Sequence, residues 1–171
     1  TVNPVIVNDT CFILTDLDPN TIYDFHVRTL CDADYSVWVK SSFHTSCNPV
    51  TEFPYFETFE PGSSFDCWRI KNDNGDELSW EISDYKPYHD DHSIRFDTDL
   101  INNFDDDYLV SVPFTLTGNE YLYYYVSTLD PDFLRSYQVL ISPTPEFLRE
   151  NTVILLEDTA STILYKAIEL D

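Results

Sequence analysis

The sequence is short of basic residues and lacks methionine altogether. Nine lysines and arginines stand against 31 aspartates and glutamates, so the formal net charge is −22 over 171 residues. Because such a surface repels phosphate backbones and anionic lipids, we expect no nucleic-acid partner and no binding to a membrane surface. Divalent cations and basic patches on other proteins would be attracted instead. A chain without methionine does not begin at a start codon, so we expect an excised or processed piece.

Long apolar runs and catalytic motifs are also missing. Without an apolar stretch long enough to cross a bilayer, we expect no membrane insertion. The sequence has no GxSxG, no HExxH and no phosphate-binding glycine loop, and no cysteine has a clear histidine partner. We therefore predict that the chain is not an enzyme. Its 43% hydrophobic and 16% aromatic residues are enough to build a folded core.

The four cysteines are spaced without a CxxC pair, which argues against zinc and thioredoxin-type sites. An even number of cysteines in an acidic, strand-rich chain is typical of an exported protein with disulfides. Free buried thiols are the alternative. We expect a secreted or cell-surface protein.

Short segments rich in β-branched and aromatic residues, separated by Pro, Asn and Asp, predict an antiparallel all-β protein. Helical turns are expected only near "TPEFLREN" and "DPDFLRS". The strand pattern breaks at "TSCNPVTEFP", so we predict two domains, residues 1–46 and 47–171. The predicted strands are "CFILTDL", "YDFHVRTL", "VWVKSSFHT", "YLYYYVSTL", "YQVLIS", "TVILLED" and "LYKAIEL".

The segment "LTDLDPNTIYDFHVRTLC" resembles part of a fibronectin type III domain, through Leu17, Pro19, Thr21 and Tyr23. The resemblance implies that residues 1–46 are the C-terminal part of such a sandwich. It also makes Tyr23 a tyrosine-corner residue, whose hydroxyl bonds back to the main chain. Domains of this kind usually act as spacers.

A disulfide between Cys11 and Cys31 is predicted from strand geometry. Cys11 would begin one strand and Cys31 would end the next antiparallel strand, which places both at the same end of the first domain.

The remainder, residues 47–171, resembles the cleaved-adhesin or choice-of-anchor J domain of Bacteroidetes surface proteins, which is similar in fold to MAM domains. The resemblance implies a jelly-roll β-sandwich that is incomplete at its C-terminal end. Three features depart from the family pattern: two loop aspartates are asparagines, a tryptophan is replaced by Tyr108, and the last strands are missing. The matching positions are Pro54, Tyr55, Glu57, Phe59, Glu60, Cys67, Trp68, Asn72, Asn74, Gly75, Asp76, Trp80 and Asp107 to Pro113.

The resemblance further implies a structural calcium ion, with Glu60 and Asp76 as its foremost ligands. Calcium prefers carboxylate, amide and main-chain oxygens. The alternative is a turn held by Asn and Asp side chains bonding to the main chain. The candidate calcium ligands are Glu60, Asn72, Asn74, Asp76 and Asp107, with Asp105 and Asp106 beside the last.

Two further patterns concern the same region. Cys47 and Cys67 flank Glu60 and predict a disulfide, and MAM-like domains pair cysteines in a similar place. His89 and His92 have a spacing that suits zinc only on a helix, whereas their surroundings favour a solvated loop.

The predicted function is that of a non-catalytic adhesin or binding module that recognises a host protein or a glycan, beside other domains of its parent protein. Candidate ligand contacts are Tyr121, Tyr123 and Tyr125, which share one face of a strand. Packing inside the sandwich is the competing use of these rings. The alternative functions are an accessory carbohydrate-binding module of a secreted glycosidase or protease, and a structural stalk.

Overall fold

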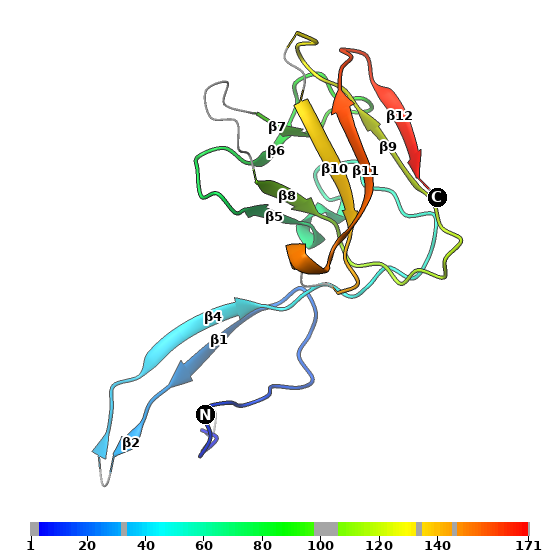
Figure 1. Cartoon of the computed structure of the whole chain (residues 1–171). Helices are drawn as coiled ribbons and strands as arrows, with labels where there is room; N and C mark the ends of the chain where they lie inside the picture. Colours follow the sequence, from blue (N-terminus) through cyan, green and yellow to red (C-terminus); the bar gives the residue numbers. More distant parts are fainter. Residues whose placement is uncertain (1–3, 32–33, 98–105, 133–134, 145–146, 171) are drawn as a thin grey trace. The chain divides into compact units, whose positions relative to one another are not determined.

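The computed structural model describes residues 4–31, 34–97, 106–132, 135–144 and 147–170. Within these ranges strands dominate, and the only helical segments are two short 3₁₀ turns, so the all-β prediction is confirmed. The chain divides into two compact units, Thr1–Asn48 and Pro49–Asp171. Every sheet among the described residues is a two-stranded antiparallel ladder (Figure 1).

The first unit is built on the ladder of β1 (Ile22–Val27) with β4 (Val39–His44), extended by the short pair β2 (Leu30–Cys31) and β3 (Asp34–Tyr35). Tyr23 lies directly opposite Phe43, and their rings stack with centroids 5.8 Å apart. Aromatic cross-strand pairs of this kind are a main source of stability in a two-stranded ribbon. The Asp18 N–H donates to the Tyr23 hydroxyl at 2.8 Å, which confirms the hydroxyl-to-main-chain bond predicted for this tyrosine.

The predicted strand "CFILTDL" is wrong, because residues 11–17 form no strand. Among the described residues no strand pairs with this segment, and Phe12, Ile13 and Leu14 are exposed. The Cys11–Cys31 bridge depended on that strand, and the structure has both cysteines as free, exposed thiols. Cys31 is instead the cross-strand partner of Asp34 in the β2–β3 pair.

The second unit contains four ladders: β5 (Arg69–Asn72) with β8 (Asp107–Val110), β6 (Trp80–Ser83) with β7 (Ser93–Phe96), β9 (Leu122–Val126) with β12 (Lys166–Leu170), and β10 (Arg135–Ile141) with β11 (Val153–Ala160). The β10–β11 register shifts between Val139 and Leu140. Figure 1 shows these ladders gathered into a sandwich-like body.

Side chains join the ladders of this unit to one another. The Tyr124 hydroxyl of β9 donates to that of Tyr137 on β10, and the Lys166 ammonium of β12 lies 2.9 Å from the Asp158 carboxylate on β11. The apolar residues that are buried most fully among those described are Val112 and Ile168, at 3% and 8% exposed. The inner face of the β9–β12 ladder is therefore the face that carries Tyr124 and Ile168.

The second unit also contains the 3₁₀ turn η1 (Ser64–Cys67), which the sequence analysis did not predict. Its N-cap Ser63 accepts a bond from the Phe65 N–H. Cys67, at its end, forms the predicted disulfide with Cys47. The second turn, η2 (Arg149–Asn151), falls within the predicted "TPEFLREN" segment, whereas "DPDFLRS" lies partly outside the described residues.

Candidate binding site

The motif residues around η1 form a hydrogen-bonded corner. The Trp68 indole N–H donates to the Tyr55 hydroxyl at 3.1 Å, and Ser64 donates to the Glu57 carboxylate at 2.8 Å. Partial burial opposes ionisation of Glu57, yet bonds from Ser63, the Phe59 N–H and Ser64 hold the pKa of its carboxyl below the usual value. The hydrogen bonds of Tyr55, Glu57, Ser64 and Trp68 therefore hold the local conformation around η1.

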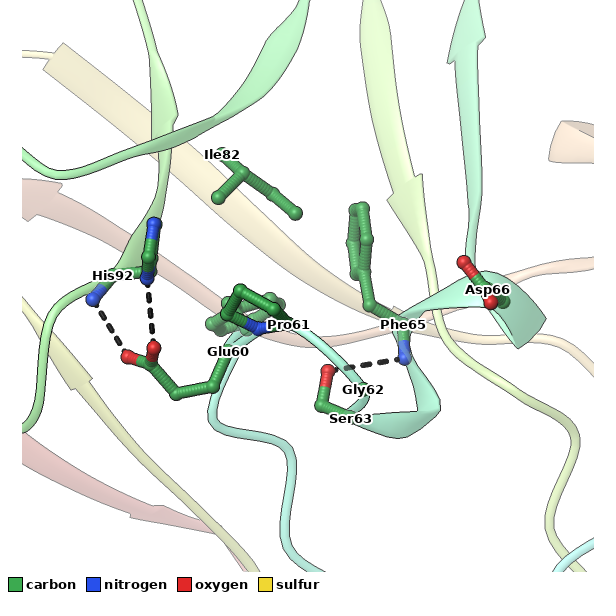
Figure 2. Close-up of a pocket in the computed structure, with 9 residues that line it drawn as sticks. Glu60, Pro61, Gly62, Ser63, Phe65, Asp66, Ile82 and His92 are labelled. Carbon is green, nitrogen blue, oxygen red and sulfur yellow. Dashed lines mark hydrogen bonds and ion pairs between the residues drawn. The ribbon is translucent and has the colours of Figure 1, made fainter.

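Glu60 lies next to this corner and turns toward the loop before β7. Its Oε1 accepts the main-chain N–H groups of Asp91 and His92 at 2.9 and 2.6 Å, and its Oε2 lies 2.7 Å from His92 Nδ1. The carboxylate lines a small open cavity of about 140 Å³. Figure 2 shows it facing His92, with Ile82 and Phe65 among the other lining residues. The hydrogen bond to Glu60 raises the pKa of His92, and the same bond lowers the pKa of Glu60.

Three of the other candidate calcium ligands, Asn72, Asn74 and Asp76, lie at the end of β5 and in the loop that follows it. Asn72 Oδ1 accepts the Gly75 N–H at 2.7 Å, while its Nδ2 donates to the carbonyls of Asp76 and Leu78. Asp76 Oδ1 accepts the Leu78 N–H at 2.8 Å, and its Oδ2 accepts a bond from the Asn74 amide. Gly75 has a φ of 71°, a conformation that glycine adopts without strain.

The structure brings some of the candidate calcium ligands together. Asn72 is the cross-strand partner of Asp107, and the Asp73 N–H donates to the Asp106 carbonyl at 3.0 Å, so the loop adjoins the start of β8. Among the described residues no hydrogen bond links Glu60 to this loop. No cluster of three His, Cys, Asp or Glu side chains suited to a metal ion occurs in the described ranges, and Asp105 lies outside them.

The two histidines considered for zinc point to separate partners. His92 bonds Glu60, whereas His89 lies 2.8 Å from the neighbouring Asp90 carboxylate and is largely exposed. The segment consists of bends, not a helix, so the spacing of three does not place both rings on a helical face.

A cluster of tyrosines covers the outer face of the β9–β12 ladder. Tyr123 and Tyr125 come from β9, and their rings meet edge to face at 5.2 Å. Tyr88, from the loop between β6 and β7, stacks on Tyr125 with centroids 3.6 Å apart, and Tyr165 meets Tyr88 edge to face at 5.2 Å. We call these four residues the tyrosine patch.

The tyrosine patch is accessible, and its rings restrain one another. Tyr88, Tyr123 and Tyr125 are 48%, 53% and 38% exposed. The Tyr123 hydroxyl donates to that of Tyr125 at 3.2 Å, and the Tyr165 hydroxyl donates to the Lys86 carbonyl at 2.7 Å. Tyr123 and Tyr125 are therefore not packed inside the sandwich, which was the competing use of these rings. Tyr124, on the opposite face of β9, is half-buried.

Sequence reasoning found only part of this patch. It predicted Tyr123 and Tyr125 but missed Tyr88 and Tyr165, and the predicted Tyr121 is 67% exposed without a ring contact to the others. The available signal was the loop "DYKPYHD", which carries two large aromatic residues among charged ones.

No protein family, curated protein or solved structure matches the chain. Among the described residues no helix is long and apolar enough to cross a membrane.

Proposed function

We propose that the chain is a non-catalytic binding module of a secreted or cell-surface protein, and that the tyrosine patch is its ligand-contacting surface. The observation that carries the proposal is a set of four mutually restrained rings on one sheet face, of which Tyr88, Tyr123 and Tyr125 are exposed. The Cys47–Cys67 disulfide supports an oxidising compartment. The all-β architecture is compatible with the adhesin-type resemblance.

Tyrosine is suited to this role for physical reasons. Each ring offers a large apolar area and a polar hydroxyl while having few rotatable bonds, so little conformational entropy is lost on binding. Rings that already stack on one another, as Tyr88 does on Tyr125, lose still less. Aromatic residues of this kind often dominate the energy of protein interfaces, and they also stack on sugar rings.

The ligand is proposed to be a host protein or a glycan. A carbohydrate-binding module attached to a secreted enzyme would use the same patch for a sugar alone, whereas a structural stalk would not use the patch at all. The test is binding of the whole chain to a glycan array and to a panel of immobilised extracellular proteins. We expect binding that the double variant Tyr123→Leu/Tyr125→Leu loses. If neither array binds, or if the variant binds equally well, the proposal is wrong.

We also propose a structural calcium ion at the loop of residues 72–76. The donor set fits in kind, since Asn72, Asp76 and Asp107 supply the hard oxygens that calcium prefers and lie at one end of the β5–β8 ladder. When bound, the ion would neutralise carboxylates and hold the loop. Glu60 fits less well, because its carboxylate is bonded to Asp91 and His92 in the loop before β7 and not to the loop of residues 72–76.

Thermal melts in EDTA and in millimolar calcium test this site. A ligand that binds only the native state stabilises it by RT ln(1 + [L]/Kd), about 2.7 kcal/mol at a hundredfold excess over Kd. We expect calcium to raise Tm in the wild type and in Glu60→Gln, but not in Asp76→Asn. An unchanged melt in the wild type would leave the loop as a turn held by its own hydrogen bonds.

A further inference from the structure

The face that carries the tyrosine patch also carries a carboxylate. In the β9–β12 register Glu169 lies directly opposite Tyr123, and Ala167 lies opposite Tyr125. Residues opposite one another in an antiparallel pair share a face, so Glu169 stands beside the ring of Tyr123. The small Ala167 leaves the ring of Tyr125 uncovered by its cross-strand neighbour. Glu169 is exposed and forms no ion pair with any described residue.

The basic residues near this face are engaged elsewhere. Lys166 alternates to the opposite face of β12, where its ammonium pairs with Asp158 on β11. Lys86 donates to the Ile163 carbonyl. Among the described residues no lysine or arginine lies over a ring of the tyrosine patch.

Other aromatic residues of this chain do hold cations. The Arg28 guanidinium lies 3.8 Å from the ring centroid of Tyr35 and 4.5 Å from that of Trp38. The Lys71 ammonium lies 5.8 Å from the Tyr108 centroid. A cation over an aromatic ring is attracted by the negative potential of the ring face. The tyrosine patch differs from these sites in that no lysine or arginine among the described residues lies over its rings.

We propose that the tyrosine patch and Glu169 together bind an arginine- or lysine-bearing segment of a partner protein. This inference rests on the proposed function and names the chemistry of the partner. The net charge of −22 attracts a basic segment over a long range, the Glu169 carboxylate pairs with one of its cations, and the exposed rings take others through cation–π contacts. A neutral glycan would use the rings but would gain nothing from the charge.

The test uses a fluorescein-labelled nine-residue peptide of alternating arginine and serine, and the same peptide with citrulline in place of arginine. Citrulline keeps the shape of the side chain and removes its charge. Fluorescence anisotropy with the whole chain at about 0.15 M salt, where long-range attraction is screened, measures Kd for each peptide. We expect the arginine peptide to bind about tenfold more tightly than the citrulline peptide, since each exposed cation–π contact contributes about two- to fivefold.

Variants separate the patch from general acidity. Tyr123→Leu/Tyr125→Leu keeps the net charge and should weaken binding of the arginine peptide about fivefold or more. Glu169→Gln should weaken it about two- to fivefold. The matched control is Tyr35→Leu, which removes an exposed tyrosine from the first unit and should leave Kd unchanged. Tyr123→Phe/Tyr125→Phe keeps the rings and should bind, which guards against a folding defect in the leucine variant.

Each result decides the matter. Equal binding of both peptides, or an arginine-peptide Kd that the leucine variant leaves unchanged, would overturn the proposal, because general attraction to an acidic protein would then suffice. Tyrosine-dependent binding to a glycan array without arginine-peptide binding would overturn this inference while leaving the proposed function intact. The absence of binding to every probe would overturn both.

Discussion

The carboxylate of Glu60 is bonded to His92 through both the main chain and the side chain, with Oε1 2.6 Å from the His92 nitrogen and Oε2 2.7 Å from Nδ1. The two residues are 32 positions apart in the sequence. Their pairing ties the segment before η1 to the loop before β7, and it turns the imidazole into a group whose charge affects folding.

Stability should depend on pH through this pair. The hydrogen bond to Glu60 raises the pKa of His92 above its ordinary 6.5, partial burial opposes this, and the negative charges of Glu60, Asp91 and Asp84 reinforce it. The pKa of Glu60 is lowered from 4.5. The stabilisation of the folded state by the Glu60–His92 pair is therefore fully present between about pH 4.5 and 6.5. It is lost as the pH rises through the pKa of His92 in the folded state.

Thermal melts at pH 6 and pH 9 check this prediction. The drop in Tm from the lower to the higher pH should be smaller in His92→Gln than in the wild type. His89→Gln is the matched control, since the ion pair of His89 among the described residues is with its exposed neighbour Asp90. Equal pH dependence in the wild type and His92→Gln would show that the pair has no such effect.

The cysteines should divide into one bonded pair and two free thiols. Thiol titration of the native, unreduced chain should count two reactive groups, Cys11 and Cys31, because both are exposed. Replacing Cys47 and Cys67 with serine should lower the free energy of unfolding by about 3 kcal/mol, the value expected for a loop of this size. The control variant Cys11→Ser/Cys31→Ser should melt like the wild type. A count of zero free thiols would contradict this assignment.

The loop of residues 72–76 should be held mainly by one side chain. Asn72 is half-buried and makes three hydrogen bonds to the main chain, so Asn72→Ala should lower stability by about 1–3 kcal/mol. Asn74 is exposed, and Asn74→Ala should have a smaller effect. Chemical denaturation of both variants in EDTA makes the comparison free of any metal. Equal losses would show that Asn72 does not organise the turn.

The hydrogen bond between the Asp18 N–H and the Tyr23 hydroxyl can be tested by removing one oxygen atom. Tyr23→Phe removes the hydroxyl that accepts the Asp18 N–H and should destabilise the first unit by about 0.5–1.5 kcal/mol. Tyr35→Phe is the control, because the Tyr35 hydroxyl makes no hydrogen bond to any described residue. Hydrogen exchange at the Asp18 amide should accelerate in Tyr23→Phe only. Unchanged exchange at this amide would show that the bond does not protect it.

The sequence by itself determined the local features of this protein. Short segments rich in β-branched and aromatic residues identified β1, β4 and β9 to β12, because strand preference is largely a property of the local residues. The spacing of Cys47 and Cys67 around one short segment predicted their bond. The resemblance of the segment around Tyr23 to a fibronectin type III domain implied the bond to the main chain, which spans five residues. "CFILTDL" shows the limit of such reasoning, since a strand-like composition forms no strand without a partner.

Only the tertiary structure decided which distant groups meet. Glu60 was expected beside Asp76, but it bonds to His92 because the loop before β7 presents two main-chain N–H groups to its carboxylate. Tyr88 and Tyr165 join Tyr125 because a loop and the approach to β12 converge on one face of β9. These contacts depend on how strands and loops that are far apart in the sequence pair with one another, and no local sequence pattern encodes that pairing.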